Sequence, residues 1–255
     1  MPAVKWVIIG AAVIGAATAI LFALFPQWDL AIAGYFYSHG GFPVALQPWA
    51  RAVRKIGKYL PWLFAGPAFA ALALKLVFPQ GRMLMPARAA VLIAATLALG
   101  PGLMVNGILK EYWGRPRPIH MQAFGGDHAF TPWYSPHGTC PTNCSFVSGE
   151  GATGAFLVAP ASLVPGPMGV VAMTAAVGFA LLGGGLRIAF GGHFFTDVVL
   201  SMVLVIFLIA GLRYLLYNRP RAPSDAMVEA AIGAMGLAAR RGFSAAWSRI
   251  AGSRG

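Results

Sequence analysis

Long apolar runs recur along the chain and are separated by shorter segments rich in polar residues, proline and glycine. Six of these runs approach the roughly 20 residues that a helix needs to cross a bilayer. They lie near residues 4–25, 57–78, 88–109, 146–164, 168–189 and 194–217. The pattern therefore predicts an all-α, polytopic membrane protein with six transmembrane helices. The first run is longer than the roughly 7–15 residues typical of a signal-peptide core, so we interpret it as an uncleaved span.

Two segments outside the predicted spans also show helical patterns. Between the first two spans, the stretch "WDLAIAGYFY" predicts a short helix in the membrane interface, where Trp and Tyr prefer to lie. After the last span, apolar residues recur at helical spacing: Val228, Ile232, Met235, Ala239, Phe243, Trp247 and Ile250. We expect a six-span domain at 1–217 and a basic cytoplasmic tail at 218–255. The tail is either an amphipathic helix on the cytoplasmic leaflet or partly disordered.

Composition and charge agree with a membrane location and exclude nucleic acid as a partner. The chain has 255 residues, of which 58% are hydrophobic and 10% are charged. The net charge is +12, but the basic residues form neither one arm nor one stripe, which fits anionic membrane surfaces better. Lys5, Arg82, Arg88 and the arginines after the last span share one side of a six-span topology. The positive-inside tendency therefore predicts cytoplasmic N and C termini.

The opposite, outer face is basic as well, against the same tendency. The residues concerned are Arg51, Arg54, Lys55, Lys58, Lys110, Arg115, Arg117 and Arg187. An anionic ligand on the outer face would explain them.

Two local clusters on this face favour anion binding. The third span delivers Lys110 to the outer boundary, and Gly114 and two prolines then hold Arg115 and Arg117 in extended backbone. Snorkelling anchors at a helix end are the alternative. Ser145, Ser148 and Gly149 lie where the fourth span begins, and helix N-termini offer free N–H groups to anions. An N-cap with small residues for tight helix packing is the alternative there.

A third cluster contains a candidate nucleophile. Arg187 ends the fifth span, His193 begins the sixth, and Asp197 follows His193 by four residues. On a helix, His193 and Asp197 share one face, so the carboxylate can accept a hydrogen bond from the imidazole. This arrangement suits His193 as a nucleophile or base, whereas a buried His–Asp pair between helices is the alternative. Together the clusters offer the donors that the equatorial oxygens of a transferring phosphoryl group require.

These residues resemble the motifs of the type-2 phosphatidic acid phosphatase superfamily, which comprises membrane lipid phosphatases related to vanadium haloperoxidases. The family pattern is Lys-x6-Arg-Pro, then Pro-Ser-Gly-His, then Ser-Arg-x5-His-x3-Asp. The corresponding stretches here are Lys110-x6-Arg117-Pro118, Val147-Ser148-Gly149-Glu150 and Leu186-Arg187-x5-His193-x3-Asp197. The first motif is complete, Leu186 replaces Ser in the third, and Val147 and Glu150 replace Pro and His in the second. The resemblance covers about residues 1–217.

The resemblance implies an active site at the periplasmic ends of spans three to six that uses no metal or cofactor. It implies that His193 attacks phosphorus to form a phosphohistidine and that Asp197 orients it. The implied phosphate ligands are Lys110, Arg117, Ser148, Gly149 and Arg187.

Glu150 occupies the position of the family's general acid, and three roles stay open for this chemistry. Glu150 is an acid with a raised pKa, or it orients water or a substrate hydroxyl. Otherwise the acid comes from His120, His128 or His137 in the preceding loop. We favour the first two roles.

The outer loop before the second motif contains both cysteines of the chain, Cys140 and Cys144. Because this loop faces the oxidising side, we expect a disulfide that positions Ser148 and Glu150. A metal site with the three loop histidines is the alternative, but their spacing fits no zinc pattern.

The expected function is removal of phosphate from a membrane lipid at the outer face of a bacterial inner membrane. The "CSFVSGE" form of the second motif resembles lipid A phosphatases, while undecaprenyl diphosphate and phosphatidylglycerophosphate are alternative substrates. The expected partners are the bilayer and the lipid substrate, with no obligate protein partner. A non-catalytic anion-binding protein or transporter is the alternative of another class. A transporter should carry polar residues at mid-membrane and inverted repeats, whereas the span interiors here are nearly free of charge.

Overall fold

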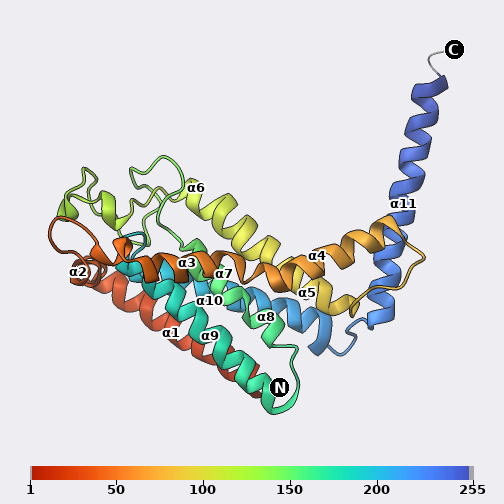
Figure 1. The fold of residues 1–255 in the computed structure, drawn as a ribbon, viewed down its shortest axis with the longest axis horizontal. Coiled ribbons are helices and arrows are strands. Elements are labelled where there is room, and N and C mark those ends of the chain that lie inside the picture. The colour runs from red at the N-terminus through yellow and green to blue at the C-terminus, as the bar shows by residue number, and fades with distance from the viewer. Residues whose placement is uncertain (1, 253–255) are drawn as a thin grey trace.

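The computed structural model describes residues 2–252, and its regular elements are helices (Figure 1). The longer helices are α1 (Pro2–Leu24), α3 (Pro48–Tyr59), α4 (Trp62–Val77), α5 (Ala87–Leu97), α9 (Gly166–Ala189), α10 (Phe195–Arg213) and α11 (Asp225–Gly252). The shorter α-helices are α2 (Gln27–Tyr35), α6 (Lys110–Tyr112), α7 (Gly149–Phe156) and α8 (Val158–Ala161). Three short 3-10 helices are η1 (Pro43–Leu46), η3 (Pro118–His120) and η4 (Gln122–Phe124). Two π-helical segments are η2 (Ala98–Leu109) and η5 (Tyr214–Asn218). The prediction of an all-helical fold is confirmed.

Five helical segments of the described chain are long and apolar enough to cross a membrane. They are Ala3–Leu24, Pro48–Val77, Ala87–Tyr112, Gly166–Ala189 and Phe195–Asn218. The fourth run of the sequence pattern, 146–164, is not among them because it forms two short helices, α7 and α8. Pro160 has no N–H to donate to the carbonyl of Phe156, and the helix is interrupted at Leu157. The six-span count therefore stays a prediction.

The segment that contains α7 is nevertheless at the centre of the bundle. α7 packs against α9, α10 and η2. Two of its glycines allow this close approach: a Cβ at Gly154 would meet the backbone of Ala180 on α9, and one at Gly151 would meet Ser201 on α10. Small residues at such positions let helices pack backbone to backbone. α7 is therefore held on two sides, and so is the site that begins at its N-terminus.

The third candidate span changes its helical geometry before it reaches the site. η2, from Ala98 to Leu109, is π-helical and contains Pro101, which has no N–H to donate. The side-chain amide of Asn106 donates a hydrogen bond to the carbonyl oxygen of Pro101, at 2.7 Å. This wider stretch ends at α6, which begins with Lys110. The irregular geometry thus lies directly before the first basic motif.

The long helices lie side by side, and the connections gather at the two ends of the bundle (Figure 1). α2 and the long loop from residue 113 to residue 148 lie at one end, and α11 lies beyond the other. α11 runs across the direction of the bundle helices rather than along it. Three apolar residues of the helical pattern predicted for the tail, Phe243, Trp247 and Ile250, have side chains outside the described part of the structure.

Two ion pairs attach α11 to the bundle. The ammonium of Lys75 on α4, only 7% exposed, lies 3.0 Å from a carboxylate oxygen of Glu229. Asp225 accepts hydrogen bonds from the backbone N–H of Arg88 at 2.9 Å and from its guanidinium at 2.8 Å and 3.0 Å. Because Lys75 is buried, its carboxylate partner matters more than a surface partner would.

Replacing both Asp225 and Glu229 with alanine is expected to detach α11 from the bundle. The change removes both anchoring carboxylates, so protease cleavage after residue 225 should be faster, on the order of severalfold, in the full chain in detergent. Arg221→Ala, at an exposed position just before α11, is the matched control. Equal cleavage rates in the double variant and the control would contradict this account of how α11 is held.

Candidate active site

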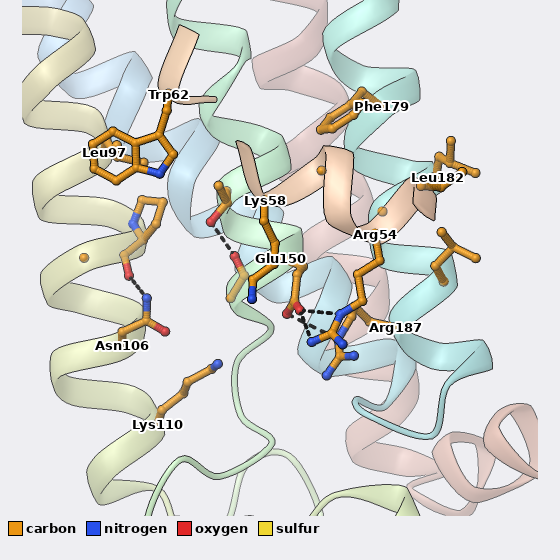
Figure 2. A pocket seen from close by; sticks show the side chains of 18 of the residues that line it. Arg54, Lys58, Trp62, Leu97, Asn106, Lys110, Glu150, Phe179, Leu182 and Arg187 are labelled. Atoms are coloured by element: carbon orange, nitrogen blue, oxygen red, sulfur yellow. Dashed lines mark hydrogen bonds and ion pairs between the residues drawn. The ribbon is translucent and has the colours of Figure 1, made fainter. Parts of the chain in front are cut away.

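A cavity of about 560 Å³ lies between α3, α4, η2, α7 and α9 and combines a charged part with an apolar part (Figure 2). The charged lining consists of Arg54, Lys58, Lys110, Arg117, Glu150 and Arg187. The apolar lining includes Trp62, Phe69, Leu97, Phe179 and Leu182. Such a cavity suits a ligand with an anionic head and an apolar body.

The start of α7 lies at the charged part of the cavity, as the sequence predicts. Ser148 is the N-cap, and its Oγ accepts a hydrogen bond from the N–H of Gly151 at 3.2 Å. A Cβ built on Gly149 would lie 3.0 Å from Nζ of Lys110. Any larger residue at position 149 would therefore crowd the ammonium group, and glycine leaves this space open. Lys110 and the free N–H groups of the helix start are thus brought together.

Glu150 lies at the centre of the charged lining and is held by two arginines. Its Oε1 accepts hydrogen bonds from Arg54 at 3.0 Å and 3.2 Å, and its Oε2 lies 3.2 Å from Nε of Arg187. Figure 2 shows both guanidinium groups converging on this carboxylate, with Lys110 on the other side of it. Positive charges at this distance favour the ionised form of a carboxyl group. In the empty site these contacts therefore favour the ionised form of Glu150 rather than the protonated acid expected from the sequence, and Arg54 is a partner that the motifs do not contain.

His193 lies behind Glu150 with one ring nitrogen engaged and the other free. Its Nδ1 is 2.7 Å from the carbonyl oxygen of Ser145. Because a carbonyl only accepts, Nδ1 carries the proton and Nε2 carries the lone pair in the neutral ring. Nε2 has no hydrogen-bond partner among the described residues and lies 3.9 Å from Oε2 of Glu150. Nε2 is therefore the unengaged ring nitrogen, and it lies behind Glu150 because the ring is buried and His193 is not among the residues that line the cavity.

Burial sets the charge of this imidazole. It lowers the pKa of His193 to about 4, although the carboxylate of Asp197 acts in the opposite direction. The ring is consequently neutral at pH 7, which is the form that a nucleophile requires.

The direct hydrogen bond between His193 and Asp197 that the spacing predicts is replaced by an indirect one. Oδ2 of Asp197 lies 3.9 Å from Nδ1 of His193, too far for a hydrogen bond. Asp197 instead accepts from Oγ of Ser145 at 2.5 Å, from the N–H of Phe194 at 2.9 Å and from Arg115 at 2.5 Å. Because these donors occupy the carboxylate, it acts on His193 through Ser145, whose carbonyl holds the ring.

Arg115 belongs to the basic outer face but does not reach the cavity. Its side chain is 0% exposed and bridges Asp197 on α10 and Asp29 on α2, the latter at 2.8 Å. Thr196 adds to the network by donating to Asp29 from its hydroxyl at 2.6 Å. The guanidinium also lies 4.3 Å from the ring centroid of Phe194. Asp29 belongs to none of the motifs, and its only signal in the sequence is a lone acid in the apolar stretch "WDLAIAGYFY".

A disulfide-closed loop lies along the first motif. Cys140 and Cys144 are bonded to each other. The N–H of Cys144 donates to the carbonyl of Lys110 at 3.0 Å, and the N–H of Ser145 donates to the carbonyl of Arg115 at 2.7 Å. Within the loop, Asn143 accepts two hydrogen bonds from Arg117, at 2.8 Å and 2.9 Å. The loop thus positions both the carbonyl that holds His193 and the guanidinium of Arg117.

The histidines of the outer loop lie away from this site. None of His120, His128 and His137 is among the residues that line the cavity. Nδ1 of His128 instead pairs with the hydroxyl of Thr139 at 2.7 Å. Across residues 2–252, no three His, Cys, Asp or Glu side chains gather in a way that could hold a metal ion. The interpretation in which a loop histidine supplies the acid has no support from the geometry.

Comparison with known proteins gives one consistent result. The sequence pattern of the PAP2 superfamily matches residues 89–221. The chain is 33% identical over 198 residues to a Lipid A 4'-phosphatase of Francisella tularensis subsp. novicida, which covers 73% of this chain and 85% of that protein. It is 42% identical over 114 residues to a Lipid A 4'-phosphatase of Rhizobium leguminosarum, covering 44% of this chain and 49% of that protein. No solved structure gives a significant match.

Replacing Arg115 with leucine is expected to destabilise the protein far more than the same change at Arg117. The first variant leaves the carboxylates of Asp29 and Asp197 buried without their shared cation, which costs about 3–5 kcal/mol for a broken buried pair. Arg117 is partly exposed and is the matched control. Thermal unfolding of both variants in detergent measures the difference. If the two variants unfold at the same temperature, the buried network does not have this stabilising role.

Proposed function

The chain belongs to the PAP2 superfamily and is a membrane lipid phosphate phosphatase, and we propose that its substrate is the 4'-phosphate of lipid A. One observation carries the proposal: a cationic cavity end, with Nε2 of His193 free behind it, continues into an apolar wall. The two Rhizobium and Francisella relatives named above bear the name Lipid A 4'-phosphatase. The Francisella protein matches over most of its length, which supports a shared substrate.

In the proposed mechanism, the cations hold the phosphoryl oxygens and His193 is the nucleophile. Lys110, Arg117 and Arg187 neutralise the phosphate, and the N-terminus of α7 adds the Gly149 N–H and the Ser148 hydroxyl. Nε2 of His193 bonds to phosphorus as the ester P–O bond breaks, and the leaving alcohol oxygen takes up a proton. Water then attacks phosphorus and gives up one proton, which balances the proton taken up by the leaving alcohol, while the N–P bond breaks and its electron pair returns to Nε2.

Asp197 has an indirect role in this mechanism. Through Ser145 it keeps the imidazole in the tautomer that leaves Nε2 unprotonated. Its carboxylate, 3.9 Å from Nδ1, also stabilises the positive ring that forms when Nε2 is phosphorylated. Asp197 therefore positions and stabilises His193, and it takes no proton.

The proposed topology has six membrane crossings, with the interrupted helix α7–α8 as the fourth. Figure 1 supports this because α8 leads to the end of the bundle opposite the long loop 113–148. The termini then lie in the cytoplasm and the active site faces the periplasm of a bacterial inner membrane. In this topology residues 1–217 are the catalytic domain, and α11 in the tail 218–255 lies along the cytoplasmic leaflet, where its arginines meet anionic lipids.

His193→Ala is expected to reduce phosphate release from lipid A by about a thousandfold or more, because it removes the nucleophile. His137→Ala, on the exposed part of the outer loop, is the matched control and should keep the wild-type rate. Released phosphate is measured with the purified full chain in detergent, and vanadate should inhibit while a chelator should not. Equal release by wild type and His193→Ala would refute the phosphohistidine mechanism. Molybdate binding without any phosphate release would instead indicate a non-catalytic anion-binding protein.

The position of the removed phosphate tests the substrate assignment. With lipid A that carries both the 1- and the 4'-phosphate, mass spectrometry should show loss of one phosphate, from the 4' position. Lipid A that carries only the 1-phosphate should lose none. Faster release from undecaprenyl diphosphate or phosphatidylglycerophosphate in the same assay would reassign the substrate within the family.

A further inference from the structure

The carboxylate of Glu150 lies where the proposed function requires a phosphoryl group. Arg54 donates two hydrogen bonds to Oε1 of this carboxylate, and Nε of Arg187 lies 3.2 Å from Oε2 as an ion pair. The free Nε2 of His193 faces the same carboxylate, 3.9 Å away. Side chains that would bind and attack a phosphate therefore converge on an anion that belongs to the protein itself.

Two anions cannot share this place without a change in protonation. The charged and titratable groups around Glu150 are Arg54 and Lys58 on α3, Lys110 on α6, Arg117 in the following loop, Arg187 on α9, His193 before α10 and Asp197 on α10. Asp197 is engaged by Arg115, so the remaining set is cationic and keeps Glu150 ionised while the cavity is empty. An arriving phosphate takes over these cations and adds negative charge beside the carboxyl group. Like charges at short distance favour protonation of one of them.

We propose that Glu150 is a resident anion, which holds the phosphoryl position in the empty site and becomes the protonated general acid when a phosphate displaces it. The inference rests on the proposed function only in taking the cavity as the phosphate site. A carboxyl group can then act as the general acid where the family motif has histidine, because the negative charge of the bound phosphate favours protonation of Glu150.

The proton can be followed through the whole cycle. The displaced carboxylate takes one proton from solvent as the phosphate binds. Glu150 gives that proton to the leaving alcohol oxygen while the P–O bond breaks and the bond from Nε2 of His193 to phosphorus forms. In the second half, Glu150 takes a proton from the attacking water as the new P–O bond forms and the N–P bond breaks. When phosphate leaves, the proton returns to solvent and the carboxylate pairs again with Arg54.

Arg54 has two successive roles in this mechanism: it first positions Glu150 and then binds the phosphate. In the empty site it positions Glu150 through a two-pronged contact from α3, an element outside all three motifs. Once Glu150 is displaced, the same guanidinium is free to hold a phosphoryl oxygen, which suits its planar fork. Arg54 is 39% exposed in its side chain, so it can follow this exchange without repacking the core.

Binding of molybdate, a tetrahedral dianion, to the full chain in detergent tests the inference without any lipid. Calorimetry in buffers of different ionisation enthalpy should show uptake of about one proton for each molybdate bound. Raising the pH favours the competing carboxylate, so the affinity should fall by up to about tenfold per pH unit. In Glu150→Gln both effects should disappear, and molybdate should bind more tightly at pH 7.5, by roughly tenfold. Glu111→Gln, at an exposed position close to Lys110, is the matched control and should behave as wild type.

Proton uptake or a pH slope that persists in Glu150→Gln would overturn the inference, as would weaker binding by that variant. Arg54→Gln provides a second test, because it should weaken molybdate binding while proton uptake persists, and Arg54→Lys should restore part of the affinity. Unchanged affinity in Arg54→Gln would remove Arg54 from the phosphate site. A protein that hydrolyses lipid A without Glu150-dependent proton uptake contradicts this inference alone. A protein that takes up the proton on binding molybdate but does not hydrolyse lipid A contradicts only the substrate assignment.

Discussion

The buried guanidinium of Arg115 is the contact on which the geometry of the site depends. It joins Asp29 on α2 to Asp197 on α10, and all three side chains are almost completely withdrawn from solvent. Charges in such a place are tolerated only when each is paired and hydrogen-bonded. The network therefore admits one arrangement of the N-terminal helices, the outer loop and the start of α10. The network thus joins three segments that are distant in the sequence.

His193, which lies just before α10, is oriented by this network through Ser145 rather than by a direct hydrogen bond from Asp197. Asp197 holds the hydroxyl of Ser145, and the carbonyl of Ser145 holds His193. The disulfide-closed loop pins Ser145 against the first motif through the backbone contacts of Cys144. The loop can thus control the tautomer of His193, because the carbonyl of Ser145 decides which ring nitrogen is protonated.

The cavity has an excess of positive charge, because five basic side chains and one carboxylate line it. The carboxylate of Glu150 neutralises part of this charge while the site is empty, which a neutral histidine side chain would not do. Arg54 is central to this balance, and it comes from α3, which packs against α9. The site therefore includes an element that precedes every motif, and the identity of residue 150 and the presence of Arg54 are linked by electrostatics.

Local patterns in the sequence determined which segments are helical and apolar and which side chains are candidates for the chemistry. Lys110, Gly149, Glu150 and Arg187 do meet at one cavity, because motifs at the same ends of neighbouring helices are brought together by the fold. The tertiary structure alone decided the partners of these groups. The indirect link from Asp197 to His193, the pairing of Arg115 with Asp29 and the contact of Arg54 with Glu150 join residues up to 96 positions apart. Periodicity and spacing describe one helix at a time, whereas these contacts depend on how helices pack and on which buried charges must be neutralised.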